Sequence, residues 1–289
     1  MPTSSLPEDS LLATLKSGLP SALPQFLVRQ RWFGGKARTI RSVQLSDVVP
    51  FYCGTLHSYL ILAQVEYAGG AAETYDVPLV RVSDVLVQPG NSSLLTVRPE
   101  DFTEEIVLKD ALTDQQFRAC LLEAMAKGVS LRGGRGRVRT VSTPALQALW
   151  QSSEGSLTSS LMNAEQSNSS VVYEKRLVLK MFRRLEEGLN PDLEIGSFLT
   201  GKTSFRNVPP LAGYLEYLTD EGTSSALGML QGYVVNQGDA WQFTLKALAE
   251  YYERAPGWGG SGASEIPNAS LLTLCGQSIP NSRCFRTRR

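Results

Sequence analysis

Histidine is almost missing from this sequence, and cysteine is scarce. The one histidine is His57, and the four cysteines form no CxxC pair. Zinc sites need clusters of such residues at short spacing, so no zinc site is predicted, and His57 is expected to be structural or exposed. We expect all the cysteines to be reduced thiols of a cytoplasmic protein. They are Cys53, Cys120, Cys275 and Cys284.

Net charge and long apolar runs are absent as well. Lys and Arg together number 28, as do Asp and Glu, so the whole chain has no electrostatic attraction to nucleic acid or anionic membranes. No apolar run reaches the roughly 18 residues of a membrane span, and the first residues lack the pattern of a secretion signal. We therefore expect neither nucleic acid nor a membrane as partner. The remaining composition, 289 residues with 42% hydrophobic, fits a globular protein of about two domains.

Two basic stretches need separate interpretation. Residues 30–38 interleave arginines with Trp32 and Phe33, and residues 132–139 place four arginines among glycines. Such stretches can contact a nucleic acid strand through stacking and charge. Because no wider basic field accompanies them, we predict instead that the aromatic rings anchor a turn and that the arginines surround a hairpin turn in solvent.

The first half of the chain predicts a curved antiparallel sheet and at least two helices. Three runs of β-branched and aromatic residues alternate in part, and Gly69 and Gly70 separate the second from the third. A short amphipathic helix is expected over residues 9–16. A longer helix is expected from the capping box at Thr113 to Lys127, where Gly128 closes it. The three strand runs are residues 42–51, 57–67 and 73–82.

The second half is organised around a lysine inside an apolar strand, residues 176–182. Side-chain alternation places Leu177, Leu179 and Met181 on one face and Lys180 on the other. A lysine ammonium among apolar neighbours is costly unless an anionic group meets it. The sequence therefore predicts a carboxylate partner for Lys180.

A helix that comes after this strand offers the partner. Asn190 is its predicted N-cap, Pro191 its first residue and Gly201 its end. Its predicted inward face is apolar and consists of Ile195, Phe198 and Leu199. Glu194 lies one turn inside this helix, within reach of Lys180.

A strand lysine paired with a helix glutamate is how protein kinases hold the α- and β-phosphates of ATP. A loop of small polar residues, 163–170, precedes the strand and can cover phosphates with backbone N–H groups. Residues 231–235 leave a later strand as a kinase hinge does. This order is typical of a kinase N-lobe. In the alternative interpretation, Lys180 and Glu194 form an ordinary salt bridge in an α+β domain.

Five strings in this region closely resemble bacterial maltokinase, and the resemblance spans about residues 26–254. That family transfers the γ-phosphate of ATP to the anomeric hydroxyl of maltose, giving maltose 1-phosphate for glycogen-type glucan biosynthesis, and it is sometimes fused to trehalose synthase. The resemblance implies that residues 30–38 open the family's N-terminal cap domain. The strings are residues 165–173, 177–186, 190–196, 208–213 and 230–241.

The resemblance also implies what this chain does not contain. Related kinases carry a His-Gly-Asp-x-His catalytic loop and a later Asp-containing motif that holds Mg²⁺, yet His57 is the only histidine and precedes the N-lobe. Asp239 is predicted to cap the first C-lobe helix, with Trp241 and Leu245 on its packing face, and residues 256–289 look foreign to the family. We interpret them as an irregular tail, with a frameshift near Ala255 as the simplest explanation.

The predicted fold class is therefore α+β: a protein-kinase-like N-lobe preceded by an α+β cap domain, with the C-lobe largely missing. The expected divisions are an N-terminal segment (1–25), the cap domain (26–130), the kinase-like intermediate and N-lobe (131–235), the start of the C-lobe (236–255) and the irregular tail (256–289). By the family's roles, Lys180 would hold the ATP phosphates, Glu194 would orient Lys180, the loop residues would cover the phosphates and the hinge would line the adenine. The implied ATP-binding residues are Lys180, Glu194, Gln166, Ser167, Asn168, Ser169, Ser170, Gln231, Gly232, Tyr233 and Val234.

By family the expected activity is that of a maltokinase, with ATP as substrate and Mg²⁺ required but its ligands absent. No catalytic residue and no metal ligand is assigned within this chain, so it is predicted to be inactive alone, and maltose is a partner only if a C-lobe is supplied. The resemblance also implies trehalose synthase as a partner or a fusion in the parent gene, an expectation that the sequence itself does not decide. The alternative function is a non-catalytic module that binds a nucleotide or a protein partner, including a separately encoded C-lobe. With C-lobe contacts unmet, the isolated chain is expected to expose apolar surface and aggregate.

Overall fold

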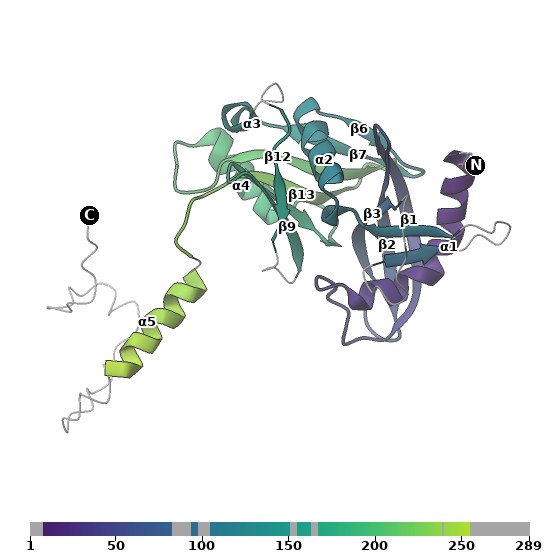
Figure 1. The fold of residues 1–289 in the computed structure, drawn as a ribbon, viewed down its shortest axis with the longest axis horizontal. Coiled ribbons are helices and arrows are strands. Elements are labelled where there is room, and N and C mark those ends of the chain that lie inside the picture. Colours follow the sequence, from purple (N-terminus) through teal and green to yellow (C-terminus); the bar gives the residue numbers. More distant parts are fainter. Residues whose placement is uncertain are drawn as a thin grey trace. The chain divides into compact units, whose positions relative to one another are not determined.

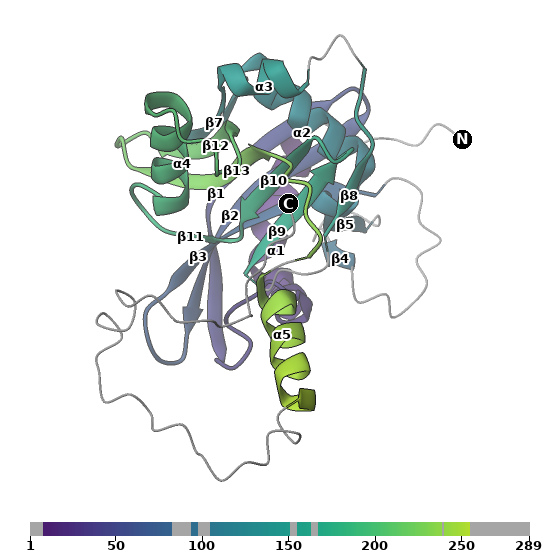
Figure 2. The same cartoon turned by 90° about the vertical axis from the view of Figure 1, so that its left-hand side faces the viewer.

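The computed structural model describes residues 8–82, 94–97, 105–150, 155–162, 167–238 and 240–254 (Figures 1 and 2). The chain forms two compact units, Met1–Val235 and Asn236–Arg289. The first unit contains two antiparallel sheets with helices packed on them, which confirms the predicted α+β class. Within the described ranges, no helix has the length and apolar character needed to span a bilayer.

The first sheet has the strand order β1-β2-β3-β5-β4, with β11 paired to β3. Its long hairpins confirm the predicted antiparallel runs, and Gly54 (φ 60°) and Gly70 (φ 87°) supply the left-handed backbone that the two turns need. The register of β1 shifts between Leu45 and Asp47, which marks a bulge. The strands are β1 (Ile40–Cys53), β2 (Leu56–Tyr67), β3 (Glu73–Arg81), β4 (Leu94–Val97), β5 (Ile106–Asp110) and β11 (Arg184–Leu185).

Helix α1 (Glu8–Arg29) packs on this sheet and is much longer than predicted. The prediction of a short helix over residues 9–16 was wrong in its length, because α1 continues through Pro20 and Pro24 to Arg29. Two internal prolines cost about 6 kcal/mol together, but five buried leucines at every fourth position stabilise the helix by roughly 10 kcal/mol. These leucines are Leu11, Leu15, Leu19, Leu23 and Leu27.

The second sheet has the order β6-β7-β12-β13-β10-β9-β8, and every pairing in it is antiparallel. Helices α2 (Gln115–Lys127) and α3 (Pro144–Leu149) contribute to the large core on one face, while α4 (Pro191–Lys202) contributes to a small cluster on the other (Figure 2). A single turn of 3₁₀ helix, η1 (Ala111–Thr113), leads into α2. The strands are β6 (Ser130–Arg132), β7 (Gly136–Ser142), β8 (Ser159–Leu161), β9 (Asn168–Tyr173), β10 (Leu177–Phe182), β12 (Leu211–Thr219) and β13 (Ser224–Gly232).

The ends of α2 have the predicted chemistry with a one-residue shift at the start. Asp114, not Thr113, is the N-cap, and its carboxylate accepts hydrogen bonds from the backbone N–H groups of Gln116 and Phe117. Gly128 closes the helix in the left-handed conformation (φ 65°), as predicted.

The two sheets are joined by one continuous segment of chain. Strand β10 belongs to the second sheet, and two residues after Phe182 the same chain pairs with β3 of the first sheet as β11. A second link is the buried carboxylate of Asp47 in the β1 bulge. It accepts hydrogen bonds from the N–H groups of Gly134 and Arg135 in the β6–β7 turn and from the hydroxyl of Tyr217 on β12.

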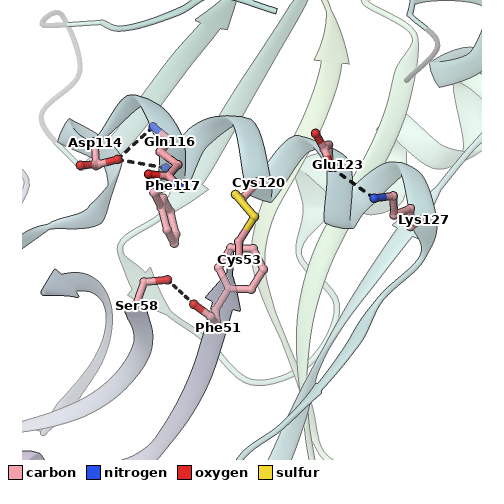
Figure 3. Close-up of a disulfide and its surroundings, with 9 residues drawn as sticks. All are labelled: Phe51, Cys53, Ser58, Asp114, Gln116, Phe117, Cys120, Glu123 and Lys127. Carbon is pink, nitrogen blue, oxygen red and sulfur yellow. Dashed lines mark hydrogen bonds and ion pairs between the residues drawn. A yellow bond between two sulfur atoms is a disulfide. The ribbon is translucent and has the colours of Figure 1, made fainter. Parts of the chain in front are cut away.

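A disulfide joins Cys53 at the end of β1 to Cys120 in α2 (Figure 3). The expectation that these two cysteines are reduced was therefore wrong. The two residues lie 67 positions apart, and only the packing of α2 beside the β1–β2 hairpin brings their sulfur atoms together, so no local spacing could indicate the bond. The cytoplasmic location was predicted partly from reduced cysteines. Because disulfides are rare in the cytosol, the cysteines no longer support that prediction.

Both basic stretches take the structural roles predicted for them. Trp32 and Phe33 are buried in the core under α1 and are not available to stack on bases. The four arginines lie in or beside the β6–β7 hairpin, where Arg132 pairs with Asp220 and Arg139 pairs with Glu216. These are exposed or half-exposed ion pairs, so the hairpin interpretation is confirmed.

The second unit contains helix α5 (Ala240–Arg254), at the position of the helix predicted to follow the hinge. Its apolar face is exposed. The predicted cap Asp239 and the tail of residues 256–289 lie outside the described residues. The exposed large side chains on this face are Trp241, Leu245, Leu248 and Tyr252.

Candidate functional site

Lys180 lies in the middle of the second sheet, flanked on both sides by hydrogen-bonded strands. Its register partners are Ser170 on β9 and Met229 on β13, so these three side chains share one face of the sheet. Leu179 and Met181, the residues before and after Lys180 in β10, are fully buried on the opposite face, in the large core. The predicted alternation is confirmed, and the ammonium leaves the sheet on the side covered by α4.

The carboxylate partner of Lys180 is Asp192, not Glu194. The Nζ atom of Lys180 lies 2.7 Å from Oδ2 of Asp192, with side-chain exposures of 27% and 58%. Residues two positions apart in a helix point in directions about 200° apart, so a helix that presents Asp192 to the sheet turns Glu194 away from it. The prediction of the helix and of a carboxylate was correct, and the choice of residue was wrong.

The side of α4 that faces the sheet also differs from the prediction. Leu193 packs against the small cluster, Gly196 lies close to Met229, and Thr200 accepts a hydrogen bond from the backbone N–H of Leu211. The predicted inward residues Ile195 and Phe198 are instead 57% and 58% exposed. The helix therefore contacts the sheet through Leu193, Gly196 and Thr200, and two of the three residues of the predicted apolar face remain in solvent.

The predicted phosphate-covering loop is only partly described. Gln166 lies outside the described residues, Ser167 precedes β9, and Asn168, Ser169 and Ser170 already belong to β9. The side chains of Ser169 and Ser170 are buried, and the Ser169 hydroxyl accepts a hydrogen bond from Arg183 Nε at 2.8 Å. These two serines are therefore buried on opposite faces of the sheet, and the part of the predicted loop that can reach a phosphate ends at Ser167.

The predicted hinge begins at the end of β13. Gln231 and Gly232 are its last residues, and Val234 is exposed. The N–H of Gly232 donates to the carbonyl of Pro210 at 2.9 Å, and the N–H of Tyr233 donates to the carbonyl of Arg176 at 2.8 Å. These two bonds fix where the chain leaves the sheet and occupy two of the hinge donors.

A buried polar cluster around Arg183, three residues after Lys180 in the sequence, was missed by the sequence analysis. Arg183 is only 1% exposed, its Nη2 lies 2.5 Å from Oδ2 of Asp110, and its guanidinium lies 4.4 Å from the centre of the Trp32 ring. Asp76 is also buried here, and burial raises the pKa of its carboxyl to about 7, partly opposed by Arg183 and reinforced by Asp110. The available signal was an arginine directly after the apolar residues of β10, where a charge needs buried partners.

The described part of the chain has no group of three or more His, Cys, Asp or Glu side chains arranged to hold a metal ion. The donor set around Lys180 consists of one carboxylate already paired with an ammonium. These residues do not fit the Mg²⁺ that a kinase requires, and no catalytic step through a metal is assigned to them.

Comparison with known proteins identifies the first part of the chain. Residues 26–114 match the maltokinase N-terminal cap domain, which confirms the resemblance over that segment. The chain is also similar to a glucosamine kinase solved in complex with glucosamine, ADP and inorganic phosphate, with 16% identity, a TM-score of 0.42, and coverage of 81% of this chain and 43% of that one. A second crystal form of glucosamine kinase gives 16% identity, a TM-score of 0.44, and coverage of 84% and 45%. This chain thus spans less than half the length of these glucosamine kinases.

Proposed function

We propose that this chain, whose residues 26–114 are a maltokinase N-terminal cap domain, is the cap and nucleotide-holding part of an ATP-dependent sugar kinase. The substrate we propose for the complete enzyme is maltose, phosphorylated at its anomeric hydroxyl. The single observation that carries the nucleotide role is Lys180, a partly exposed ammonium at the centre of a buried sheet, paired at 2.7 Å with a carboxylate from α4.

The roles within this site derive from the geometry around Lys180. The ammonium would hold the α- and β-phosphates, and Asp192 would orient it, the role first expected of Glu194. Backbone groups up to Ser167 would cover the phosphates, while residues 231–234 would line the adenine. Phosphoryl transfer also needs a positioned sugar and neutralised charge. The described residues show no groups for either, so we propose that this chain binds ATP without phosphorylating maltose.

Nucleotide binding is tested with Lys180→Met and the matched control Lys202→Met, which alters an exposed lysine in the last turn of α4. We expect ATP at about 100 times its Kd to raise the free energy of unfolding of the wild type by roughly 2.7 kcal/mol. The control should show the same increase in the free energy of unfolding. For Lys180→Met the increase should be smaller by at least about 1.4 kcal/mol, which corresponds to at least about tenfold weaker ATP binding. Calorimetric titration with ATP and MgCl₂ measures the same affinities directly.

Equal ATP affinities of the wild type and Lys180→Met would refute the role of Lys180, and a wild type that binds no ATP would refute the nucleotide function. Formation of maltose 1-phosphate by the purified chain would refute the proposal that it lacks the catalytic machinery.

The second candidate is a non-catalytic module that binds a protein partner such as a separate C-lobe. It is favoured by the exposed apolar face of α5, formed by Trp241, Leu245, Leu248 and Tyr252. Isolated chain that is monodisperse and melts cooperatively, with no ATP-dependent shift, would leave neither candidate supported.

A further inference from the structure

We propose that Arg183 is a positioning residue through which the cap domain fixes β9 and the Lys180 strand for the phosphates of the nucleotide. This inference rests on the proposed nucleotide function and adds a specific residue and a direction of coupling. Arg183 does not face the nucleotide in this scheme, because its side chain is almost completely buried.

The contacts of Arg183 come from both sheets. Its Nη2 pairs with Asp110 at the end of β5, and its guanidinium lies over the ring of Trp32, both within the matched cap segment. Its Nε donates to the hydroxyl of Ser169 on β9 at 2.8 Å. Its backbone carbonyl accepts a hydrogen bond from the N–H of Asp76 on β3 at 2.8 Å. One residue therefore ties three cap residues to a strand of the other sheet.

The position of Arg183 in the sequence connects these contacts to the nucleotide site. It stands three residues after Lys180 on the segment that runs from β10 into β11. Ser169, which it holds, precedes Ser170, the register partner of Lys180. A shift of Arg183 would therefore move both the strand that carries the lysine and the strand that leads out of the phosphate-covering loop.

The energetics indicate that the cap domain determines the position of the Arg183 side chain. A buried guanidinium is stabilised only while its partners are correctly placed, because removing one partner leaves an uncompensated buried charge. Asp110 is itself fixed, since its Oδ1 accepts a hydrogen bond from the N–H of Leu112 at 2.9 Å. The cap thus presents a fixed carboxylate, and the guanidinium transmits that position to Ser169.

The test uses Asp110→Asn, which keeps the acceptor for Leu112 but removes the charge that faces Arg183. Asp220→Asn is the matched control, because it removes the charge from an exposed Asp–Arg pair with Arg132. Ser169→Ala is a milder variant that removes only the acceptor on β9, and it serves if Asp110→Asn does not fold.

Two readouts separate positioning from general loosening. The first is hydrogen exchange of the backbone amides of β9, which needs no ligand. The second is the ratio of the affinities for ATP and adenosine, since adenosine lacks phosphates and reports only on the hinge. We expect Asp110→Asn to speed exchange in β9 by at least about tenfold and to weaken ATP about tenfold, with adenosine affinity within about twofold of the wild type. Asp220→Asn should change neither readout.

Combining Asp110→Asn with Ser169→Ala should weaken ATP no further than Asp110→Asn alone, because both act through one guanidinium. Additive effects would overturn the proposal, as would wild-type exchange rates in β9 of Asp110→Asn or an equal loss of ATP and adenosine affinity. A wild-type chain that binds no ATP would overturn the proposed function and the nucleotide role of Arg183, while the exchange measurement would still decide whether the cap and β9 are coupled.

Discussion

Reduction of the Cys53–Cys120 disulfide is expected to lower the free energy of unfolding by about 4 kcal/mol. The bond closes a loop across 67 positions of the sequence, and the loss of loop-closure entropy from the unfolded state gives this magnitude for a loop of that length. Such a change is a large part of the roughly 5–15 kcal/mol that a typical domain has in total.

The perturbation is made in two independent ways, by adding a phosphine reductant and by the double substitution Cys53→Ser with Cys120→Ser. Urea unfolding monitored by tryptophan fluorescence measures the free energy, since Trp32 and Trp150 are buried in the unit that holds the bond. The control is Cys275→Ser with Cys284→Ser, which leaves this bond intact and should respond to the reductant as the wild type does. The double Cys53/Cys120 variant should not respond to it.

Alkylation of the denatured protein checks the bond itself. Peptides that contain Cys53 and Cys120 should be protected from iodoacetamide before reduction and labelled after it. Full labelling without reductant would refute the covalent link. An unfolding free energy that the reductant does not change would refute its contribution to stability.

Three other substitutions test features of the fold. Asp47→Ala removes the buried acceptor of Tyr217 and of two turn N–H groups, so it should cost at least about 3 kcal/mol in urea unfolding, and a loss below about 1 kcal/mol would contradict the link between the sheets. The pKa of Asp76 is raised to about 7 from 3.8, so its contribution to stability is complete below about pH 4 and is lost as the pH rises to about 7, by up to roughly 4 kcal/mol. Asp76→Asn should therefore flatten the pH dependence of the urea midpoint between about pH 4 and pH 8, and an unchanged profile would show that this carboxyl does not titrate there. Asp192→Asn breaks an ion pair that is more than half exposed on the acid side and should change stability by less than about 1 kcal/mol, so a larger loss would show that the pair is structural.

Local patterns in the sequence were sufficient for several elements and for the position of Lys180 in its strand. The alternation around Lys180, the N-cap Asn190 and the left-handed Gly128 each depend on a few neighbouring residues, and all three are confirmed. The length of α1 was missed because the leucines that stabilise it act through packing on a sheet, a contribution that propensity rules for proline do not contain.

The features of the site that were predicted wrongly or missed depend on the orientation of a helix or on residues distant in the sequence. Asp192 and Glu194 are equally good carboxylates in sequence, and only the rotation of α4 about its axis decides between them. Arg183 gathers Asp110 and Trp32 across 73 and more positions of sequence. No short window contains such a cluster, so only the folded chain reveals it.

The segment that leaves β10 and pairs with β3 as β11 limits how this protein can be divided. A fragment that starts after residue 130 would keep β10 but lose β3, the strand with which β11 pairs. It would also lose Asp110, whose carboxylate neutralises Arg183. A fragment that ends before residue 130 would leave an unpaired edge on β3. Neither fragment is expected to fold stably by itself. Expression trials should therefore retain residues 8–235 together and vary only the residues beyond 235.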